Sequence, residues 1–352
     1  MLFEFEGKII SGVLSVLPEN EYIFEEENID PQDIKNRRLK RIIGFGKRRR
    51  VKADTTLSEM LLYGMRYLMD HDMLQKEQIG AIVVSTLSQD FLLPQISMIL
   101  HGELGLSPGV FCIDSPQACG GFVVGLLEAF MLLEHMQDRK VILCTGEIFN
   151  RRTNPNEPKL EHPSFGGDIA NIAVLENTSE HHKIYANAYS DGSQRNALLI
   201  RDGGFKYPMT EEKLKAQINH SPIMGVEMDG SAVFNFVQKE VPPAIEELLE
   251  MSKLQMDEID YFLFHQPNKF MLQKLAEKLG VPYSKIPMNI TEELGNSDSG
   301  TIPAVMTFDL SKQLTEKQWK CCLSGFGGGL SWTSMLMDIG PLDFCESIDS
   351  PF

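Results

Sequence analysis

Short apolar runs alternate along the chain with longer segments of helical character. The short runs are rich in β-branched and aromatic residues, which is typical of buried strands. Strands are expected over 81–86, 110–113, 140–145, 172–175 and 261–264, with a strand pair over 320–337. Helices are expected over 57–71, 94–104, 120–136, 233–251 and 269–279. This alternation predicts an α/β protein with mostly parallel sheets.

The segment that follows residue 120 is apolar almost all round. It opens with Phe122, Val123 and Val124 and remains largely apolar as far as Leu133. A helix without a polar face has to be covered on all sides, which predicts a central helix between two sheets. A functional group at its amino end would lie deep in the molecule and be reached by a tunnel.

The chain divides into two halves in this interpretation, residues 1–180 and 181–352. The polar, glycine-containing segment 177–221 is the expected link between them. The order of the elements, and not any visible sequence match, suggests that the halves are similar. The first half carries Cys119, and the second carries His265, Asn296 and a glycine run at 327–329.

Charge and composition exclude some classes of function. The formal net charge of −16 argues against a nucleic-acid partner, since phosphate contacts need a basic face. Residues 37–52 run against this balance, with nine Lys or Arg and no acid. This stretch is either a solvated surface run or a patch that steers a phosphorylated carrier toward the protein.

The six cysteines form no CxxC pair and no zinc-binding spacing, so no metal site is expected. Their pattern suits a reducing compartment. The longest apolar run is too short to span a bilayer, which argues against a membrane protein. Glu4 and Glu6 stand where a signal peptide would be basic or apolar, so a cytoplasmic location is expected.

Cys119 is the leading candidate for a nucleophile. It lies between a predicted strand and the apolar helix, where the positive end of the helix dipole is expected to favour the thiolate. Gly120 and Gly121 would let a substrate approach the backbone closely. The unpaired N–H groups of the first helical turn could bind a developing oxyanion. The alternative is a structural cysteine at a tight turn.

Two further candidates lie downstream. His265 follows a predicted strand directly, which is where α/β proteins place functional groups, and a neutral imidazole there could take or donate a proton. Asn296 stands in a Gly-Asn-Ser turn and is either a turn former or a hydrogen-bond donor to an enolate. His265 could equally be a structural histidine.

The glycine run at 327–329 is expected inside a strand, where it marks either a close approach of the backbone to a ligand or a β-bulge. No Gly-Lys-Ser/Thr follows it, so it is not a P-loop. Asp168, in a second glycine cluster, is interpreted as a brace for a turn beside the cysteine more than as a catalyst.

Five motifs in a fixed order resemble the type III β-ketoacyl-acyl-carrier-protein synthases of the thiolase superfamily. They are Ala-Cys-Gly-Gly-Phe at 118–122, Phe-Gly-Gly-Asp at 165–168, His-Gln-Pro-Asn at 265–268, Gly-Asn-Ser at 295–297 and Gly-Phe-Gly-Gly-Gly at 325–329. The resemblance implies an α/β protein with a five-layer αβαβα fold built from two similar halves, and a homodimer.

The resemblance also implies roles for individual residues. Cys119, His265 and Asn296 would be catalytic, with the backbone N–H groups of Cys119 and Gly328 as the oxyanion hole. The cysteine would be acylated by an acyl-CoA or acyl-carrier thioester. Malonyl on an acyl carrier protein would then lose CO2, and its enolate would attack the acyl group to give a β-ketoacyl thioester, with no metal or redox cofactor. Substrate-binding residues would be Leu93, Phe165, Ser231, Phe234, Asn268 and Phe326, with Leu93 lining the acyl tunnel of the partner subunit.

The chain departs from the family pattern at several positions. Phe270 stands where initiating enzymes have an arginine that docks the carrier protein, residues 37–41 lack the tryptophan that stacks on the CoA adenine, and Ser231 replaces a frequent Asn. These departures favour a paralogue that serves a secondary pathway. A degradative thiolase would need a second cysteine where Gly325 stands. Two alternatives stay open: acyl transfer to an alcohol or amine without carbon–carbon bond formation, and a partner subunit of a ketosynthase.

Overall fold

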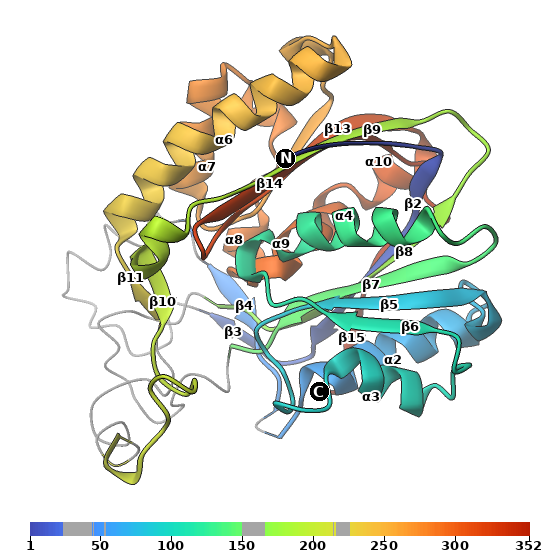
Figure 1. Ribbon diagram of the computed structural model, residues 1–352, viewed down its shortest axis with the longest axis vertical. Helices are drawn as coiled ribbons and strands as arrows, with labels where there is room; N and C mark the ends of the chain where they lie inside the picture. Colours follow the sequence, from blue (N-terminus) through green and yellow to red (C-terminus); the bar gives the residue numbers. More distant parts are fainter. Residues whose placement is uncertain (24–43, 45, 53, 150–165, 214, 216–225) are drawn as a thin grey trace.

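The computed structural model describes residues 1–23, 44, 46–52, 54–149, 166–213, 215 and 226–352. Within these residues, two sheets lie between three layers of helices (Figure 1). The outer layers are α6 (Gly230–Ser252) with α7 (Lys269–Leu279), and α2 (Leu57–Asp70) with α3 (Ile96–Glu103). The central layer is α4 (Gly121–Leu133) with α9 (Thr301–Asp309). The order of layers is therefore αβαβα, as predicted.

Each sheet has its own strand order among the described residues. The five-stranded sheet runs β1 (Leu2–Glu6), β9 (Lys183–Ser190), β14 (Ser331–Ile339), β13 (Trp319–Gly327) and β12 (Tyr261–Phe264). The six-stranded sheet runs β15 (Phe344–Ser350), β2 (Lys8–Pro18), β8 (Ile169–Asn177), β7 (Lys140–Glu147), β5 (Ile79–Ser85) and β6 (Phe111–Asp114). The remaining elements are β3 (Glu21–Ile23), β4 (Lys47–Arg49), β10 (Leu198–Ile200), β11 (Val226–Met228), α8 (Ile290–Glu293) and α10 (Ser311–Glu316).

The sheets are mixed, so the expectation of mostly parallel sheets is wrong. Parallel pairs join β12 to β13, β5 to β6 and to β7, and β15 to β2, whereas the other pairs in these two sheets are antiparallel. Strands β12 and β6 nevertheless belong to the parallel pairs β12–β13 and β5–β6. His265 follows the carboxyl end of β12, and Cys119 follows the carboxyl end of β6.

Four strands of the two sheets were not predicted: β1, β2, β9 and β15. Strand β2 carries buried polar residues that interrupt its apolar pattern. Ser15, for example, donates to Asn171 Oδ1 at 2.6 Å and lies 2.7 Å from Thr307 Oγ1, so its hydroxyl is satisfied in the core. Strand β9 occupies 183–190 inside the segment expected to link the halves, and that expectation is wrong for these residues.

Both ends of the chain complete a sheet that is built mainly from the other half. Strand β1 pairs with β9 in the five-stranded sheet, and β15 pairs with β2 in the six-stranded sheet. The division at residues 180 and 181 is therefore a prediction about sequence halves, because hydrogen-bonded strands cross it in both directions.

Helix α4 lies between the two sheets, as its apolar sequence predicts. It contacts β5 and β7 on one side and β13 and β14 on the other, and its core residues include Phe122, Leu126 and Phe130. These three side chains are almost fully buried and join a single core cluster with residues of both sheets. Burial on this scale fixes the position of the helix and therefore of the residues at its amino end.

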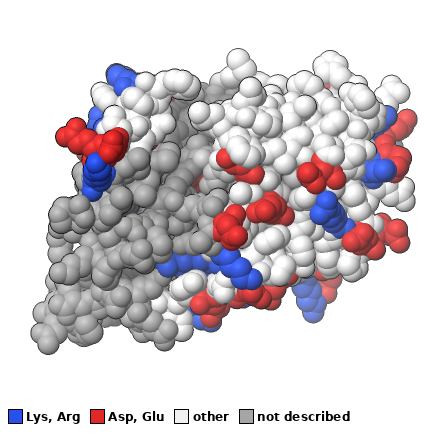
Figure 2. Space-filling model, turned by 90° about the horizontal axis from the view of Figure 1, so that it is seen from below, with Lys and Arg blue, Asp and Glu red and all other residues white. Residues whose placement is uncertain are grey.

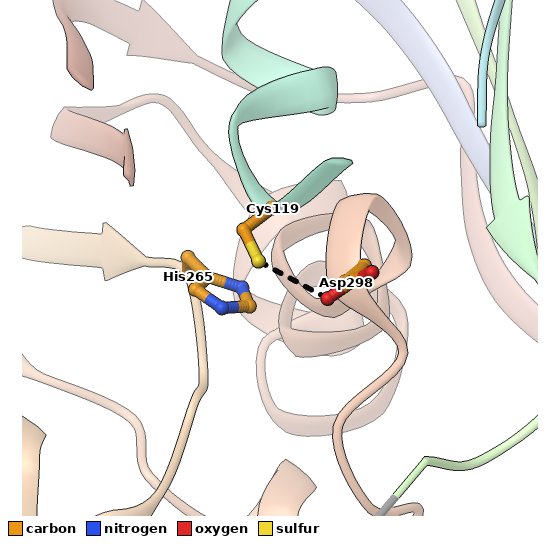
Figure 3. A group of neighbouring side chains, drawn as sticks. All are labelled: Cys119, His265 and Asp298. Carbon is orange, nitrogen blue, oxygen red and sulfur yellow. Dashed lines mark hydrogen bonds between the residues drawn. The ribbon is translucent and has the colours of Figure 1, made fainter. Parts of the chain in front are cut away.

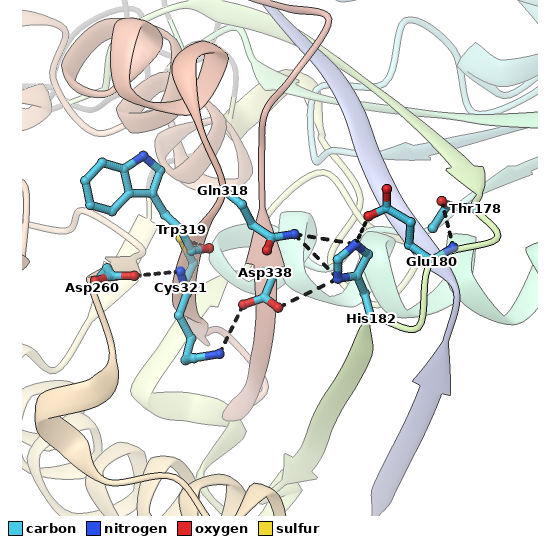
Figure 4. A network of polar contacts seen from close by, with 9 residues as sticks. Thr178, Glu180, His182, Asp260, Gln318, Trp319, Cys321 and Asp338 are labelled. Carbon is cyan, nitrogen blue, oxygen red and sulfur yellow. Dashed lines mark hydrogen bonds and ion pairs between the residues drawn. The ribbon is translucent and has the colours of Figure 1, made fainter.

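A polar network lies at the edge of the sheet where β9, β12 and β13 begin and β14 ends (Figure 4). It is therefore far from the carboxyl ends of β12 and β13. His182 lies 2.6 Å from a carboxylate oxygen of Glu180 and 3.8 Å from one of Asp338. Lys320 pairs with Asp338 at 3.2 Å, and its backbone N–H donates to Asp260. These groups satisfy one another across strand ends, which is a structural role.

The basic stretch is largely paired with acids where the structure describes it. Lys47, Arg49 and Lys52 lie within ion-pair distance of Glu21, Asp349 and Glu19 respectively. Arg48 is buried, and desolvation lowers its pKa to about 9, with Arg50 contributing in the same direction. The charges of Lys47, Arg49 and Lys52 are therefore paired with acids, and residues 37–43 lie outside the described residues.

Charges of both signs are interspersed over the described part of the face shown in Figure 2. None of the described helices combines the length and the apolar character that crossing a bilayer demands.

Candidate active site

Cys119 lies in a one-turn 3-10 helix, Ala118–Gly120, that leads from β6 into α4. Ala118 just before it has a φ of +44°, a left-handed conformation that costs energy for a residue with a β-carbon. Packing of α4 between the sheets holds this turn in place. The arrangement turns the sulfur away from the helix toward the two loops that carry His265 and Asp298 (Figure 3).

Glycines on β13 make room for the cysteine. A β-carbon added at Gly327 would lie 2.7 Å from the Cys119 β-carbon and 3.0 Å from its sulfur. One at Gly325 would lie 2.9 Å from the Gly120 α-carbon. The second cysteine of a degradative thiolase therefore has no space at position 325, in agreement with the sequence interpretation.

The glycine run at 327–329 is predicted to lie inside a strand, and this prediction is wrong. Gly327 ends β13, and residues 328–330 form the turn into β14. The run is neither a bulge nor a strand interior, but it does bring the backbone against Cys119 at Gly327. Gly328, the predicted oxyanion-hole residue, is the next residue along, and its role stays a prediction.

His265 directly follows β12 and is 2% exposed. Its backbone N–H donates to the Ser324 carbonyl, and its Nδ1 lies 2.9 Å from Thr301 Oγ1. The ring of Phe326 meets the imidazole edge-on, with 5.7 Å between ring centroids. Burial lowers the pKa of His265 to about 3, so the imidazole is neutral at neutral pH.

Cys119, His265 and Asp298 meet at one point (Figure 3). Ligand atoms of the three side chains, one sulfur, one ring nitrogen and one carboxylate oxygen, all lie within 4.8 Å of one another. The Cys119 thiol donates a hydrogen bond to Asp298 Oδ1 at 3.1 Å. The structure therefore brings together two of the three predicted catalytic residues and adds an acid to them.

The Cys119 sulfur is a thiol in this environment. Desolvation raises its pKa well above the usual range, and the carboxylates of Asp298 and Glu147 raise it further. A backbone hydrogen bond at the start of the helix acts in the opposite direction but is outweighed. Burial and the two carboxylates therefore oppose the thiolate that the helix dipole is expected to favour.

Asn296 belongs to the same loop as Asp298. Its side-chain oxygen accepts a hydrogen bond from the Asp298 backbone N–H at 3.0 Å, so the NH2 group is the part of the amide that can donate to a ligand. Its backbone is held by a bridge to Gly166 and by the N–H of Gly167. Asp298 itself has a φ of +46°, which aspartate tolerates better than most residues.

Asp168 is a brace, as its position in the sequence suggested. Its carboxylate accepts from the backbone N–H groups of Val51 at 3.0 Å and Phe149 at 2.7 Å. It is 2% exposed and interacts electrostatically with Arg48 and Arg50. The residue ties together three segments behind the Asn296 loop.

The predicted substrate-binding residues are scattered, and their roles stay predictions. Phe326 is buried against His265, whereas Asn268 caps α7 by accepting from Met271 N–H at 2.8 Å. Phe234 stacks on Phe270 with 5.7 Å between ring centroids. Ser231 is exposed at the start of α6, Leu93 is 80% exposed in this single chain, and Phe165 lies outside the described residues.

The sulfur, nitrogen and oxygen donors of Cys119, His265 and Asp298 form a set that zinc can use. A bound ion would, however, consume the sulfur lone pair that a nucleophile needs. The expectation that the site uses no metal stays a prediction.

Sequence reasoning did not single out Asp298 and Thr301, which contact Cys119 and His265, although both residues lie close to Asn296 in the chain. The available signal was an acid placed two residues after a suspected catalytic asparagine, in a loop that opens a helix. Only the fold reveals that this loop faces Cys119, because 179 residues separate the two positions in sequence.

Comparison with known proteins places this geometry in a family. Residues 249–339 match the family described as 3-oxoacyl-[acyl-carrier-protein (ACP)] synthase III C terminal. A β-ketoacyl-[acyl-carrier-protein] synthase III of Streptococcus gordonii is 31% identical over 275 residues, which cover 76% of this chain and 82% of the relative. The chain belongs to the β-ketoacyl-acyl-carrier-protein synthase III family. It thus has the enzyme class and the thiolase-like fold that the motifs predicted.

Other members of the family span the whole chain. A putative 3-oxoacyl-[acyl-carrier-protein] synthase 3 of Campylobacter jejuni is 28% identical over 349 residues, with 97% of each chain covered. The crystal structure of a 3-oxoacyl-(acyl-carrier protein) synthase from Burkholderia xenovorans superposes with a TM-score of 0.88, at 26% identity and with 99% of each chain covered. Identities this low within the family agree with a divergent member.

Proposed function

We propose that this synthase III family member acylates itself on Cys119 from an acyl-CoA or acyl-carrier thioester. It then condenses the acyl group with a malonyl thioester and releases a β-ketoacyl thioester and CO2. The observation that carries the proposal is the meeting of the Cys119 sulfur with the His265 imidazole within 4.8 Å, at the amino end of a central helix. One small group can touch both side chains at that distance.

The first half-reaction is thioester exchange. The Cys119 sulfur attacks the acyl carbonyl, and its oxygen acquires negative charge. The backbone N–H groups of Cys119 and Gly328 are the proposed oxyanion hole, and Gly327 provides the close approach of backbone to sulfur that such a hole needs. Each donor of this kind is worth roughly 3–4 kcal/mol of transition-state stabilisation.

The second half-reaction needs donors and not a strong base. Loss of CO2 from the malonyl group leaves an enolate, whose oxygen would be bound by His265 and by the NH2 group of Asn296. A histidine with a pKa of about 3 stays neutral at neutral pH, so His265 can donate a hydrogen bond from its N–H without carrying a positive charge. The hydrogen bond from Asp298 N–H to the Asn296 oxygen orients that amide accordingly.

The proposed partners are acyl-CoA, an acyl carrier protein and a second copy of the chain in a homodimer. Phe91, Leu92 and Leu93 are 59%, 86% and 80% exposed in the single chain, and burial against a second copy would remove this apolar surface from water. In this scheme Leu93 lines the partner's acyl tunnel and its size limits chain length. Catalysis would use only protein side chains and thioester substrates, without metal or prosthetic group.

Phe270 supports a secondary pathway over the housekeeping initiator. Its ring is engaged by Phe234 and lies under the Lys274 ammonium, so it cannot replace a docking arginine. Lys269, the nearest candidate to replace that charge, pairs with Glu292 at 3.5 Å. The carrier would therefore be held by contacts other than those of the initiating enzymes.

The test combines an adduct with a product. Incubation with a panel of acyl-CoAs followed by peptide mass spectrometry should place the acyl group on Cys119 and not on half-buried Cys112. Cys119→Ser should give no thioester adduct. Adding malonyl carrier should then release CO2 and a β-keto product. An unmodified Cys119 across the panel would refute the proposal, and acyl transfer to alcohols or amines without CO2 would favour the alternative acyltransferase.

A further inference from the structure

The side-chain carboxylate of Asp298, at the centre of the site, has no part in the scheme above. Asp298 accepts the Cys119 thiol hydrogen at 3.1 Å, which is short for a hydrogen bond from sulfur. The acid comes from a loop far from Cys119 in sequence, so tertiary packing alone creates the contact. A carboxylate in contact with a thiol either opposes its ionisation or accepts its proton during attack.

We propose that Asp298 is the general base of the acylation step and takes the thiol proton of Cys119 as the sulfur attacks the thioester. This inference rests on the proposed function. The S–C bond to the acyl group forms while the S–H bond breaks and the proton moves to a carboxylate oxygen. The bond between the acyl carbon and the departing sulfur then breaks, and the leaving thiolate takes the proton from the Asp298 carboxyl group. The net change is an exchange of one thiol for another, with Asp298 returned to its starting state.

The loop is built to hold this carboxylate in place. The Asp298 backbone N–H donates to the Asn296 side-chain oxygen, and its carbonyl accepts from the Thr301 hydroxyl at 3.0 Å. Gly300, two residues on, is tied to the buried amide of Asn171. The left-handed backbone at Asp298 is thus fixed from both sides, which is the preorganisation that a proton acceptor needs.

His265 is a weaker candidate for the same task. Its imidazole makes no hydrogen bond to the Cys119 sulfur, whereas the Asp298 carboxylate accepts one. Its Nδ1 is already engaged with Thr301. The carboxylate also explains how a thiol with a raised pKa can react, because proton transfer during attack avoids a free thiolate beside a negative charge.

The first experiment measures acylation and alkylation of the same sulfur. With Asp298→Asn, quenched-flow mass spectrometry should show acylation of Cys119 by acyl-CoA slowed by about 100-fold. Alkylation by iodoacetamide should instead reach its half-maximal rate at a lower pH than in wild type, since the repelling carboxylate is gone. Asp257→Asn, an exposed position, should match wild type in both assays. Opposite responses of one sulfur support a base, whereas wild-type acylation in Asp298→Asn overturns the inference.

A second experiment uses the unmodified protein, so it does not depend on the variant folding. The rates of acylation and of iodoacetamide alkylation are measured from pH 5 to pH 10. Acylation should already be near its plateau at a pH where alkylation is still rising. Coincident profiles would mean that acylation requires a preformed thiolate, and Asp298 would not be the base. A wild-type protein that forms no adduct at all contradicts the proposed function instead.

Discussion

The hydroxyl oxygen of Thr301 lies 2.9 Å from Nδ1 of His265, inside the first turn of α9. The same hydroxyl donates to the Asp298 carbonyl and receives the N–H of Gln266. When the Thr301 hydroxyl hydrogen points to the Asp298 carbonyl, the hydroxyl oxygen accepts a hydrogen bond from Nδ1–H of His265. When the hydroxyl hydrogen points to Nδ1, the proton of the imidazole is on Nε2, which can then donate to the proposed enolate. One rotating hydroxyl therefore connects the two tautomers of His265.

Thr301→Val keeps the shape of this side chain but removes the hydroxyl. We expect the rate of malonyl decarboxylation to fall by about 10- to 100-fold, because His265 loses the partner that orients it. Thr301→Ser should restore most of the rate, and Thr315→Val, at an exposed position of α10, should leave it unchanged. The rate of CO2 release from a malonyl thioester, measured on acylated enzyme in reactions quenched at fixed times, reports the effect. A wild-type rate in Thr301→Val would show that orientation of His265 does not depend on this hydroxyl.

Gly327→Ala should block acylation of Cys119. The new methyl group would lie 2.7 Å from the Cys119 β-carbon, closer than real contacts allow, and 3.0 Å from the sulfur, so the cysteine side chain would have to move. We expect the adduct seen by mass spectrometry to form at least about 100-fold more slowly, since misplaced reacting atoms cost rate steeply. Gly192→Ala, where an added β-carbon meets open space, is the matched control. Unimpaired acylation in Gly327→Ala would contradict the close packing described here.

The pKa of His265 predicts an acid sensitivity of the fold. The folded state holds this histidine with a pKa of about 3, against about 6.5 when it is exposed in the unfolded chain. As the pH falls below 6.5, the unfolded state binds a proton that the folded state does not, so stability is lost down to about pH 3. The free energy of unfolding should drop by about 1.5 kcal/mol between pH 6.5 and pH 5 from this group.

The measurement compares denaturant unfolding of wild type and His265→Gln over that range. The variant should lose about 1.5 kcal/mol less than wild type, since it has no imidazole to protonate. His135→Gln, at an exposed position, should follow the wild-type curve. Parallel curves for wild type and His265→Gln would show that His265 is not held neutral by burial.

Asn296→Ala should abolish malonyl decarboxylation while self-acylation continues, because the amide is proposed to act only on the enolate. The alanine variant also removes the oxygen that receives the Asp298 N–H, so Asn296→Asp is the sharper test. It keeps that oxygen, and it replaces the NH2 donor with a carboxylate oxygen that carries negative charge. We expect decarboxylation to fall by about 100- to 1,000-fold in both variants. Loss of acylation in both variants would mean that the role of this residue has been misassigned.

Phe270→Arg should improve the use of a generic acyl carrier protein. The substitution places a cation where initiating enzymes of the family have one, on a surface that is 38% exposed. We expect KM for the carrier to fall several-fold, more so at low salt. Phe308→Arg, at an exposed phenylalanine on α9, controls for added charge alone. An unchanged KM in Phe270→Arg would show that the carrier docks elsewhere.

The sequence by itself determined the layers, and it predicted the nucleophile. The uninterrupted apolar run after Cys119 required a covered helix, and a covered helix between strand-rich segments required two sheets. The positions of Cys119 and His265 at the junctions of strands and turns could also be predicted, because glycine and proline mark the ends of strands and helices through local conformational effects. Local patterns settle local structure and the burial of each segment.

Only the tertiary structure decided what surrounds the sulfur. The exchange of β1 and β15 between sheets, and the burial of β2 with its satisfied serines, depend on hydrogen bonds between residues far apart in sequence. The contact between Cys119 and Asp298 has the same origin, and together with burial it raises the pKa of the thiol. A helix dipole can be read from sequence, but desolvation and a neighbouring carboxylate appear only when distant segments pack together.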